Sequence, residues 1–128
     1  MMQAAPAIGF DGTIRGTGDF GEMMGSELVI VTAGFARNPG MSRIELMNSN
    51  ATVVRSVVRK VAKYAPKAKL MIVTNPVDVM TYISFKETWF TRNQLFGMGN
   101  ILDTMRFRAY LASELGVSRK DIKALVIA

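Results

Sequence analysis

Two short apolar runs, residues 28–31 (Leu-Val-Ile-Val) and 70–73 (Leu-Met-Ile-Val), lie on either side of a long segment with helical periodicity. Continuously apolar, β-branched runs of this length are typical of strands that are covered on both faces, as in a parallel sheet. Residues 94–97 and 124–127 have a similar character and predict two further strands. Strands that alternate with helices predict an α/β fold with a parallel sheet.

The first predicted helix spans Arg43 to Tyr64. Ser42 and Glu45 stand three residues apart at its start, which is the spacing of a capping box, and Pro66 marks its end. One face of this helix is apolar, at steps of four and three residues: Met47, Ala51, Val54, Val58 and Val61. This face predicts where the helix packs on the sheet.

Two more helices are predicted after the second strand. One begins at Pro76, with Asn75 as its N-cap residue. The other extends from Asn100 to Leu115 and ends at Gly116. The sequence contains no internal repeat, low-complexity tract or linker, so we expect one domain or part of one.

The composition excludes most of the catalytic chemistry that side chains supply. The 128 residues contain neither His nor Cys, which excludes a Ser-His-Asp triad, a Cys nucleophile, a disulfide and a His- or Cys-based metal site, and no metal site is predicted. The net charge of +6 favours an anionic partner: nucleic acid, a membrane surface or an acidic metabolite. No apolar run approaches the ~18 residues of a membrane-spanning helix, and no secretory signal is recognisable, so we expect a soluble intracellular protein.

Two motifs have both a functional and a structural interpretation. Residues 16–21 match Gly-x-Gly-x-x-Gly, the dinucleotide fingerprint, but too few residues follow for the helix that this motif requires. We interpret it as a glycine-rich turn. Six basic residues could bind nucleic acid: Arg55, Arg59, Lys60, Lys63, Lys67 and Lys69. Their spacing fits a solvated helix face, and no aromatic residues alternate with them, so the solvated face is the favoured interpretation.

Polar side chains follow three of the predicted strands. A loop with Arg37 and Arg43 leaves the first strand, Asn75 follows the second, and Asp103 and Arg106 follow the third on one helix face. Open α/β sheets bind ligands at the carboxyl ends of their strands, and a guanidinium matches a carboxylate. These side chains therefore predict one crevice for a small dianionic acid. Alternatively, Asp103 favours the helix dipole and pairs with Arg106.

Three segments, residues 32–43, 73–80 and 97–108, resemble the malate/lactate dehydrogenase family in order and spacing. The resemblance extends over essentially the whole chain and is closest to archaeal-type NAD-dependent malate dehydrogenases. It implies an α/β fold of Rossmann type, a parallel sheet with flanking helices, that lacks the first βαβ unit and the C-terminal substrate domain. The expected organisation is a partial NAD(P)-binding Rossmann domain over residues 1–128 that runs to the start of the substrate domain, as a central fragment.

The resemblance also implies a function, the interconversion of malate and oxaloacetate with NAD, in the tricarboxylic acid cycle and in the cytoplasm. A lactate dehydrogenase-type activity on 2-hydroxy acids is an alternative that Arg37 disfavours. A non-catalytic fragment that binds an acidic partner or nucleic acid is an alternative of another class. The implied partners are a small dicarboxylic acid and further copies of the full-length enzyme, as a dimer or tetramer, with no membrane and no nucleic acid expected.

The resemblance assigns roles to individual residues. Arg37 matches the position that meets the distal carboxylate of the substrate, and Arg43 the arginine that polarises the reacting carbonyl. Asn75 matches the asparagine that contacts the substrate oxygen and the nicotinamide. Arg106 matches the arginine that binds the C1 carboxylate, and Asp103 matches the aspartate that orients the catalytic histidine. Positions along the NAD groove are matched by Thr32, Ala33, Gly34, Asn50, Val73 and Asn75. Because the chain contains no histidine, we expect it to be inactive alone.

Overall fold

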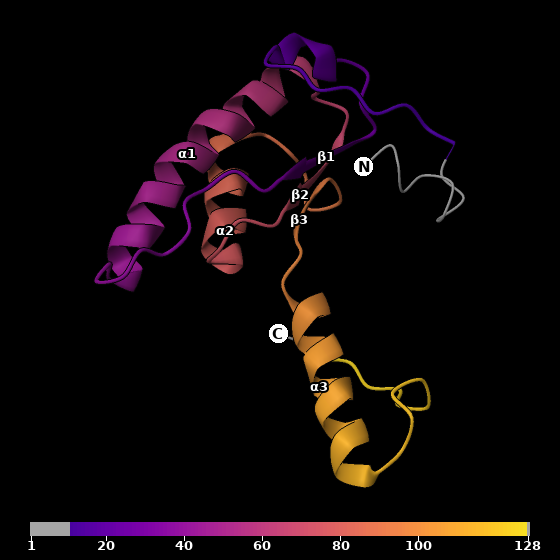
Figure 1. Ribbon diagram of the computed structural model, residues 1–128. Helices are drawn as coiled ribbons and strands as arrows, with labels where there is room; N and C mark the ends of the chain where they lie inside the picture. The colour runs from indigo at the N-terminus through magenta and orange to yellow at the C-terminus, as the bar shows by residue number, and fades with distance from the viewer. Residues whose placement is uncertain (1–10, 128) are drawn as a thin grey trace.

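The computed structural model describes residues 11–127, which form a three-stranded sheet and three α-helices (Figure 1). The strands are β1 (Leu28–Val31), β2 (Lys69–Ile72) and β3 (Leu95–Gly97), and the α-helices are α1 (Arg43–Tyr64), α2 (Val77–Glu87) and α3 (Asn100–Leu115). The strands are parallel and lie in the order β1-β2-β3. The prediction of an incomplete Rossmann-type α/β fold is confirmed.

Helix α1 has the predicted bounds, and its start is fixed by a capping box. The Ser42 Oγ accepts a hydrogen bond from the backbone N of Glu45 at 3.2 Å, and the backbone N of Ser42 donates to the Glu45 carboxylate at 2.8 Å. The predicted apolar face points into the core: Ala51, Val54, Val58 and Val61 are buried, and Met47 packs at its edge. The pattern therefore predicted the packing face of α1 correctly.

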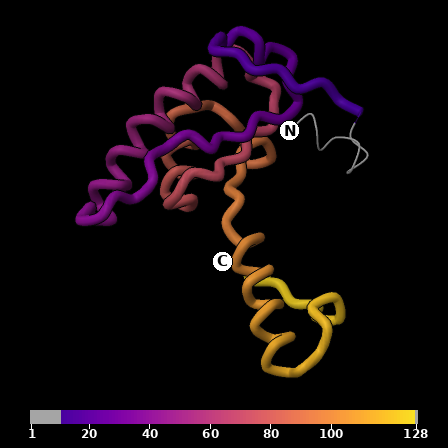
Figure 2. Tube along the Cα trace, in the orientation of Figure 1, coloured from indigo at the N-terminus to yellow at the C-terminus, as the bar shows by residue number. Residues whose placement is uncertain are grey.

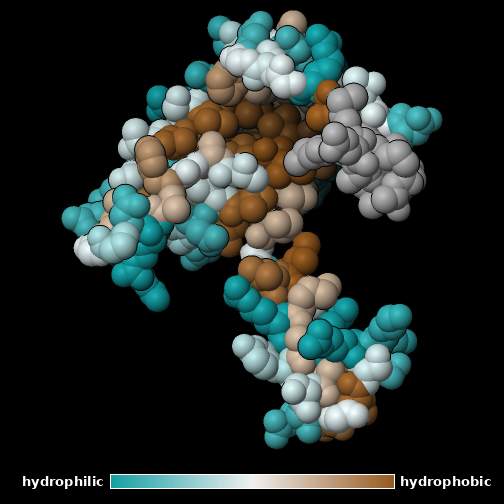
Figure 3. Space-filling model, viewed as in Figure 1, coloured by the Kyte–Doolittle hydropathy of each residue, from teal (hydrophilic) through white to brown (hydrophobic). Residues whose placement is uncertain are grey.

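The hydrophobic core lies between one face of the sheet and helices α1 and α2. Leu70 and Ile72 of β2 are fully buried, together with Met80 of α2. On the opposite face of the sheet, Ile30 of β1 is 53% exposed and Phe96 of β3 is 41% exposed. Apolar side chains gather over the middle of the molecule in Figure 3. Only one face of this sheet is therefore covered by the described residues.

The predicted N-cap of α2 is wrong by one residue. The helix begins at Val77 with Pro76 as its N-cap, and no side chain caps it. The carbonyl of Pro76 accepts the first helical hydrogen bond, from the N of Met80 at 3.0 Å. The carbonyl of Asn75 instead accepts a hydrogen bond from the side chain of Asn50, so Asn75 remains outside the helix.

The expected strand over residues 124–127 is not formed. Its backbone groups pair with side chains of α3: Val126 N donates to Thr104 Oγ1 at 3.0 Å, and Arg108 Nε donates to the carbonyl of Ala124 at 2.8 Å. Figure 2 shows this segment returning along α3, away from the sheet. An apolar run becomes a strand only when a neighbouring strand pairs with its backbone. Here side chains of α3 make hydrogen bonds with that backbone instead.

Helix α3 extends away from the sheet and is joined to it by a short connection after β3 (Figure 1). It ends as predicted at Gly116, whose φ of 64° is the left-handed conformation that glycine adopts without strain. No helix of the described residues is long and apolar enough to cross a membrane.

Candidate functional site

A pocket lies at the carboxyl ends of β1 and β2. It is lined by Thr32, Gly34, Phe35, Ala36, Arg37, Leu46, Asn50, Val73, Thr74 and Asn75. Most of the residues assigned to the NAD groove lie here, as do two of those assigned to the substrate. The sheet topology explains this, because parallel neighbouring strands deliver their following loops to the same edge.

Asn50 is a buried polar side chain that lines this pocket. It lies on the inner face of α1 and is 2% exposed. Its Oδ1 accepts a hydrogen bond from the backbone N of Phe35 at 2.7 Å, and its Nδ2 donates to the carbonyl of Asn75 at 2.8 Å. One side chain thus joins the loop after β1 to the loop after β2.

Thr74 makes a second connection between these loops. Its Oγ1 donates to the carbonyl of Ala33 at 2.8 Å and lies 3.4 Å from the carbonyl of Val31. The sequence interpretation assigned no role to Thr74. The available signal was its position directly after a buried strand, where its hydroxyl can continue the pairing with the neighbouring strand.

Arg37 lies on the exposed loop after β1 and lines the pocket. Its Nε donates to the carbonyl of Met41 at 3.1 Å, which holds the base of the guanidinium against its own loop. A turn closes this loop, with Met41 N donating to the carbonyl of Asn38 at 3.1 Å and Gly40 at a φ of 83°. A planar cation of this kind binds a carboxylate through paired hydrogen bonds.

Four of the predicted site residues do not line this pocket: Ala33, Arg43, Asp103 and Arg106. Ala33 lies between the lining residues Thr32 and Gly34. Arg43 is exposed in the first turn of α1. Asp103 and Arg106 form an ion pair at 3.2 Å on α3, with side chains 59% and 61% exposed. The structure thus shows the pairing that we gave as the alternative interpretation. Asp103 and Arg106 therefore do not line the pocket that contains Arg37 and Asn75. Helix α3, which carries them, leads away from the sheet (Figure 1).

The glycine motif of residues 16–21 does not open an α-helix. The motif instead leads into a short 3₁₀ helix, Phe20–Met23, which begins at its last two residues. The side chain of the N-cap residue Asp19 accepts a hydrogen bond from the N of Gly21 at 2.8 Å. The interpretation as a glycine-rich turn is confirmed.

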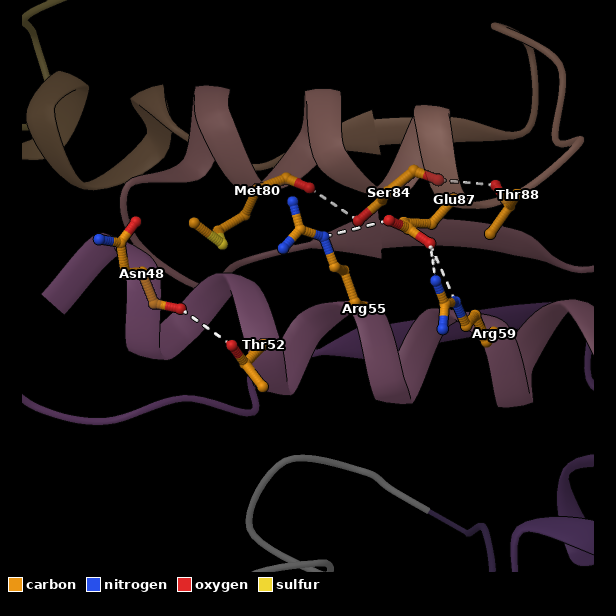
Figure 4. A network of polar contacts seen from close by, with 8 residues as sticks. All are labelled: Asn48, Thr52, Arg55, Arg59, Met80, Ser84, Glu87 and Thr88. Carbon is orange, nitrogen blue, oxygen red and sulfur yellow. Dashed lines mark hydrogen bonds and ion pairs between the residues drawn. The ribbon is translucent and has the colours of Figure 1, made fainter. Parts of the chain in front are cut away.

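The basic face of α1 is solvated and partly paired. Arg55 and Arg59 both contact the carboxylate of Glu87 on α2, at 3.1 Å and 2.6 Å (Figure 4). These contacts give two of the six basic residues a role in joining α1 to α2. Within residues 11–127, no three acidic side chains group together as metal ligands do.

Comparison with known proteins gives one consistent result. Residues 4–97 match the family model of the lactate/malate dehydrogenase NAD binding domain. A malate dehydrogenase of Geobacillus thermodenitrificans is 43% identical over 127 residues, which are 99% of this chain and 41% of that protein. A malate dehydrogenase of Oceanobacillus iheyensis is 46% identical over the same share of each chain. The chain therefore spans about two fifths of the length of these relatives.

Solved structures are similar in the same way. The apo malate dehydrogenase of Picrophilus torridus has a TM-score of 0.87 and 41% identity, over 96% of this chain and 40% of that one. The lactate dehydrogenase of Cryptosporidium parvum, solved with lactic acid and nicotinamide adenine dinucleotide, has a TM-score of 0.86 and 35% identity, over 98% of this chain and 39% of that one.

Proposed function

The chain belongs to the lactate/malate dehydrogenase family, and on this premise we propose that it is a segment of an NAD-dependent enzyme that interconverts malate and oxaloacetate. Residues 1–128 form, in this proposal, a partial NAD(P)-binding Rossmann domain that runs to the start of the substrate domain. Action in the tricarboxylic acid cycle, a cytoplasmic location and a homo-oligomeric full-length enzyme belong to the same proposal.

The observation that carries the proposal is the meeting of Arg37 and Asn75 in one pocket. The guanidinium of Arg37 supplies a fixed positive fork for the distal carboxylate of a four-carbon acid. The side-chain amide of Asn75 supplies a hydrogen-bond donor for the oxygen on the reacting carbon. A cation and an amide donor on two adjacent loops suit a small acid that carries both groups.

We propose that the same pocket holds part of the dinucleotide. Its lining includes Thr32, Gly34, Asn50, Val73 and Asn75, which the resemblance assigned to the NAD groove, and Ala33 lies between the first two. NAD, when bound, supplies a carbon that accepts or donates a hydride. The glycine motif does not supply a pyrophosphate site, because no α-helix N-terminus follows it.

The proposed roles of Arg106 and Asp103 require α3 to lie nearer to the pocket. Arg106 is proposed to hold the C1 carboxylate, and Arg43 to stabilise negative charge that develops on the reacting oxygen. Asp103 is proposed to orient a histidine, which this sequence does not contain. Support comes from the position of Asp103 and Arg106 on one face at the start of α3 and from the family match.

A chimera tests this function. This chain replaces the matching 41% of the Geobacillus thermodenitrificans malate dehydrogenase, and oxidation of NADH with oxaloacetate is measured. We expect the chimera to be active and the isolated chain to be inactive, because loss of a general base costs ~10²–10⁴ in rate. A folded chimera that turns over neither oxaloacetate nor pyruvate contradicts the proposal.

The alternatives give different results in simple assays. Preference of the chimera for pyruvate favours a lactate dehydrogenase activity. The similarity to the Cryptosporidium parvum lactate dehydrogenase is the observation that supports this alternative. A salt-sensitive mobility shift of short DNA or RNA by the isolated chain favours a nucleic-acid-binding fragment, since phosphate contacts weaken steeply with salt.

A further inference from the structure

Two side chains tie together the loops that form the pocket. Backbone pairing between β1 and β2 ends where Val73 N donates to the carbonyl of Val31 at 2.9 Å. Beyond that point, within the part of the chain that the structure describes, the hydrogen bonds between the two loops come from Asn50 and Thr74. We call Asn50 and Thr74 the loop clamp.

Asn50 uses both ends of its amide on the backbone of separate segments. Its oxygen holds the N of Phe35, two residues before Arg37, and its nitrogen holds the carbonyl of Asn75. The side chain is buried, so a broken bond leaves a polar atom without a partner or water. Movement of either loop would therefore leave a buried polar atom of Asn50 without a hydrogen bond, and this cost disfavours the movement.

Thr74 and Gly34 make this arrangement close-fitting. Thr74 is 6% exposed, and its hydroxyl holds the carbonyl of Ala33. A Cβ atom at Gly34 would lie 2.7 Å from Thr74 Cγ2 and 2.9 Å from Asn50 Oδ1. Gly34 thus lies against both clamp residues, with no room for a side chain at position 34.

We propose that Asn50 and Thr74 are positioning residues, which hold the segment that carries Arg37 in a fixed place relative to Asn75. This inference deepens the proposed function and rests on it for the nature of the ligand. The clamp acts through the backbone: it sets the separation of the Arg37 guanidinium, for the distal carboxylate, and the Asn75 amide, for the oxygen on the reacting carbon. Binding is weaker when this separation varies, because the ligand must then order both loops.

The first measurement is amide hydrogen exchange, followed by NMR on the ¹⁵N-labelled 128-residue chain. Asn50→Ala removes both amide bonds, and Thr74→Val removes only the hydroxyl. We expect exchange at the Phe35 amide to become about tenfold faster with Asn50→Ala, and exchange in the loop after β1 to become severalfold faster with Thr74→Val. Thr74→Ser keeps the hydroxyl and restores slow exchange.

Matched controls lie on the exposed side of the same helix. Asn48→Ala and Thr52→Val remove the same kinds of group from α1, where Thr52 Oγ1 bonds only to the carbonyl of Asn48. We expect both controls to exchange as the unchanged chain does. If Asn50→Ala does not fold, the pair Thr74→Val and Thr74→Ser still decides the matter. Unchanged exchange in the folded clamp variants overturns the inference.

The second measurement links the clamp to the ligand. Titration of malate is expected to shift the amide signals of Arg37 and Asn75 with one common midpoint. Thr74→Val should raise that midpoint at least about fivefold, and Thr74→Ser should return it. If the clamp variants exchange faster but bind malate within twofold of the unchanged chain, positioning is overturned. If the unchanged chain does not respond to malate, the chimera assay decides the proposed function, and hydrogen exchange alone decides whether the clamp exists.

Discussion

Thr81 of α2 lies so close to Gly97 of β3 that a Cβ atom at Gly97 would stand 2.5 Å from the Thr81 Oγ1. The threonine cannot turn aside freely, because the same oxygen donates to the carbonyl of Val77 at 2.6 Å, and Val77 Cγ2 stands 3.1 Å from the same Cβ position. Helix α2 therefore packs directly on the backbone at the end of β3. This contact fixes the end of β3 against α2.

Gly97→Ala should lower the free energy of unfolding by about 1–3 kcal/mol, the usual cost of overpacking. Urea unfolding followed by circular dichroism measures it. The double variant with Thr81→Ala should recover part of the loss, since the closest atom is gone. Gly16→Ala is the control, because nothing lies within 4 Å of a Cβ atom there. Equal stability of Gly97→Ala and the unchanged chain contradicts the close packing.

Glu87→Gln should weaken the junction of α1 and α2. The Glu87 carboxylate contacts both Arg55 and Arg59, whose side chains are 48% and 66% exposed. Exposed ion pairs contribute roughly 0–1 kcal/mol each, so we expect a loss of about 1 kcal/mol that shrinks in high salt. Thermal unfolding at low and high salt measures it, with the exposed Glu114→Gln as control. A loss that does not depend on salt indicates packing instead of charge.

The capping box of α1 should appear in the acid stability of the chain. Hydrogen bonding to the backbone N and then the hydroxyl of Ser42 lowers the pKa of the Glu45 carboxyl. A group with a lowered folded-state pKa stabilises the fold above its unfolded-state pKa, and this stabilisation is lost as the pH falls through the folded-state value. NMR titration of Glu45 should show that Ser42→Ala raises its pKa. An unchanged Glu45 titration in Ser42→Ala argues against the box.

The face of the sheet that residues 11–127 leave uncovered should make the isolated chain self-associate. Leu28, Ile30 and Phe96 are 46%, 53% and 41% exposed on that face. Exposed apolar surface of this kind favours pairing with another molecule. Ile30→Lys should reduce association in sedimentation velocity, whereas Leu115→Lys, on the exposed end of α3, should change it less. A compact monomer with a cooperative unfolding transition before any substitution rules this prediction out.

Local signals in the sequence were sufficient for most of the fold. The capping pair Ser42 and Glu45 lies within one turn, so the start of α1 follows from four consecutive residues. The prediction of a strand over residues 124–127 was wrong, because β-branched character does not reveal whether a strand edge is free beside the run. In the structure, Thr104 and Arg108 of α3 take up its backbone groups, and a pairing across that distance has no pattern in sequence.

The candidate site divides in the same way. Arg37 and Asn75 were predicted to share a crevice because parallel strands end at one edge, and they do. The role of Thr74 depends on which carbonyl lies opposite its hydroxyl, which only the packed structure shows. Arg106 was placed in the same crevice from its position after β3, but the direction of α3 depends on tertiary contacts that spacing does not record.

The last prediction concerns substrate choice, and it uses the chimera with the Geobacillus thermodenitrificans relative. Arg37 lines the pocket, and its guanidinium is proposed to bind the distal carboxylate of oxaloacetate, which pyruvate lacks. Hydrogen bonds to charged groups contribute ~1.5–3 kcal/mol, and each 1.4 kcal/mol is about tenfold in kcat/KM. Arg37→Gln should therefore lower kcat/KM for oxaloacetate by roughly one to two orders of magnitude, while pyruvate gains or is unchanged.

The control for this prediction is Arg92→Gln, which removes an exposed arginine that lies on another loop and does not line the pocket. It should leave both values of kcat/KM nearly unchanged. If Arg37→Gln behaves in the same way, the ratio of oxaloacetate to pyruvate does not depend on Arg37, and Arg37 is a solvated loop residue. The choice of malate over lactate would then lose its main support, because the other proposed substrate contacts are with features that both acids share. A ratio that falls at least about tenfold assigns recognition of the second carboxylate to Arg37.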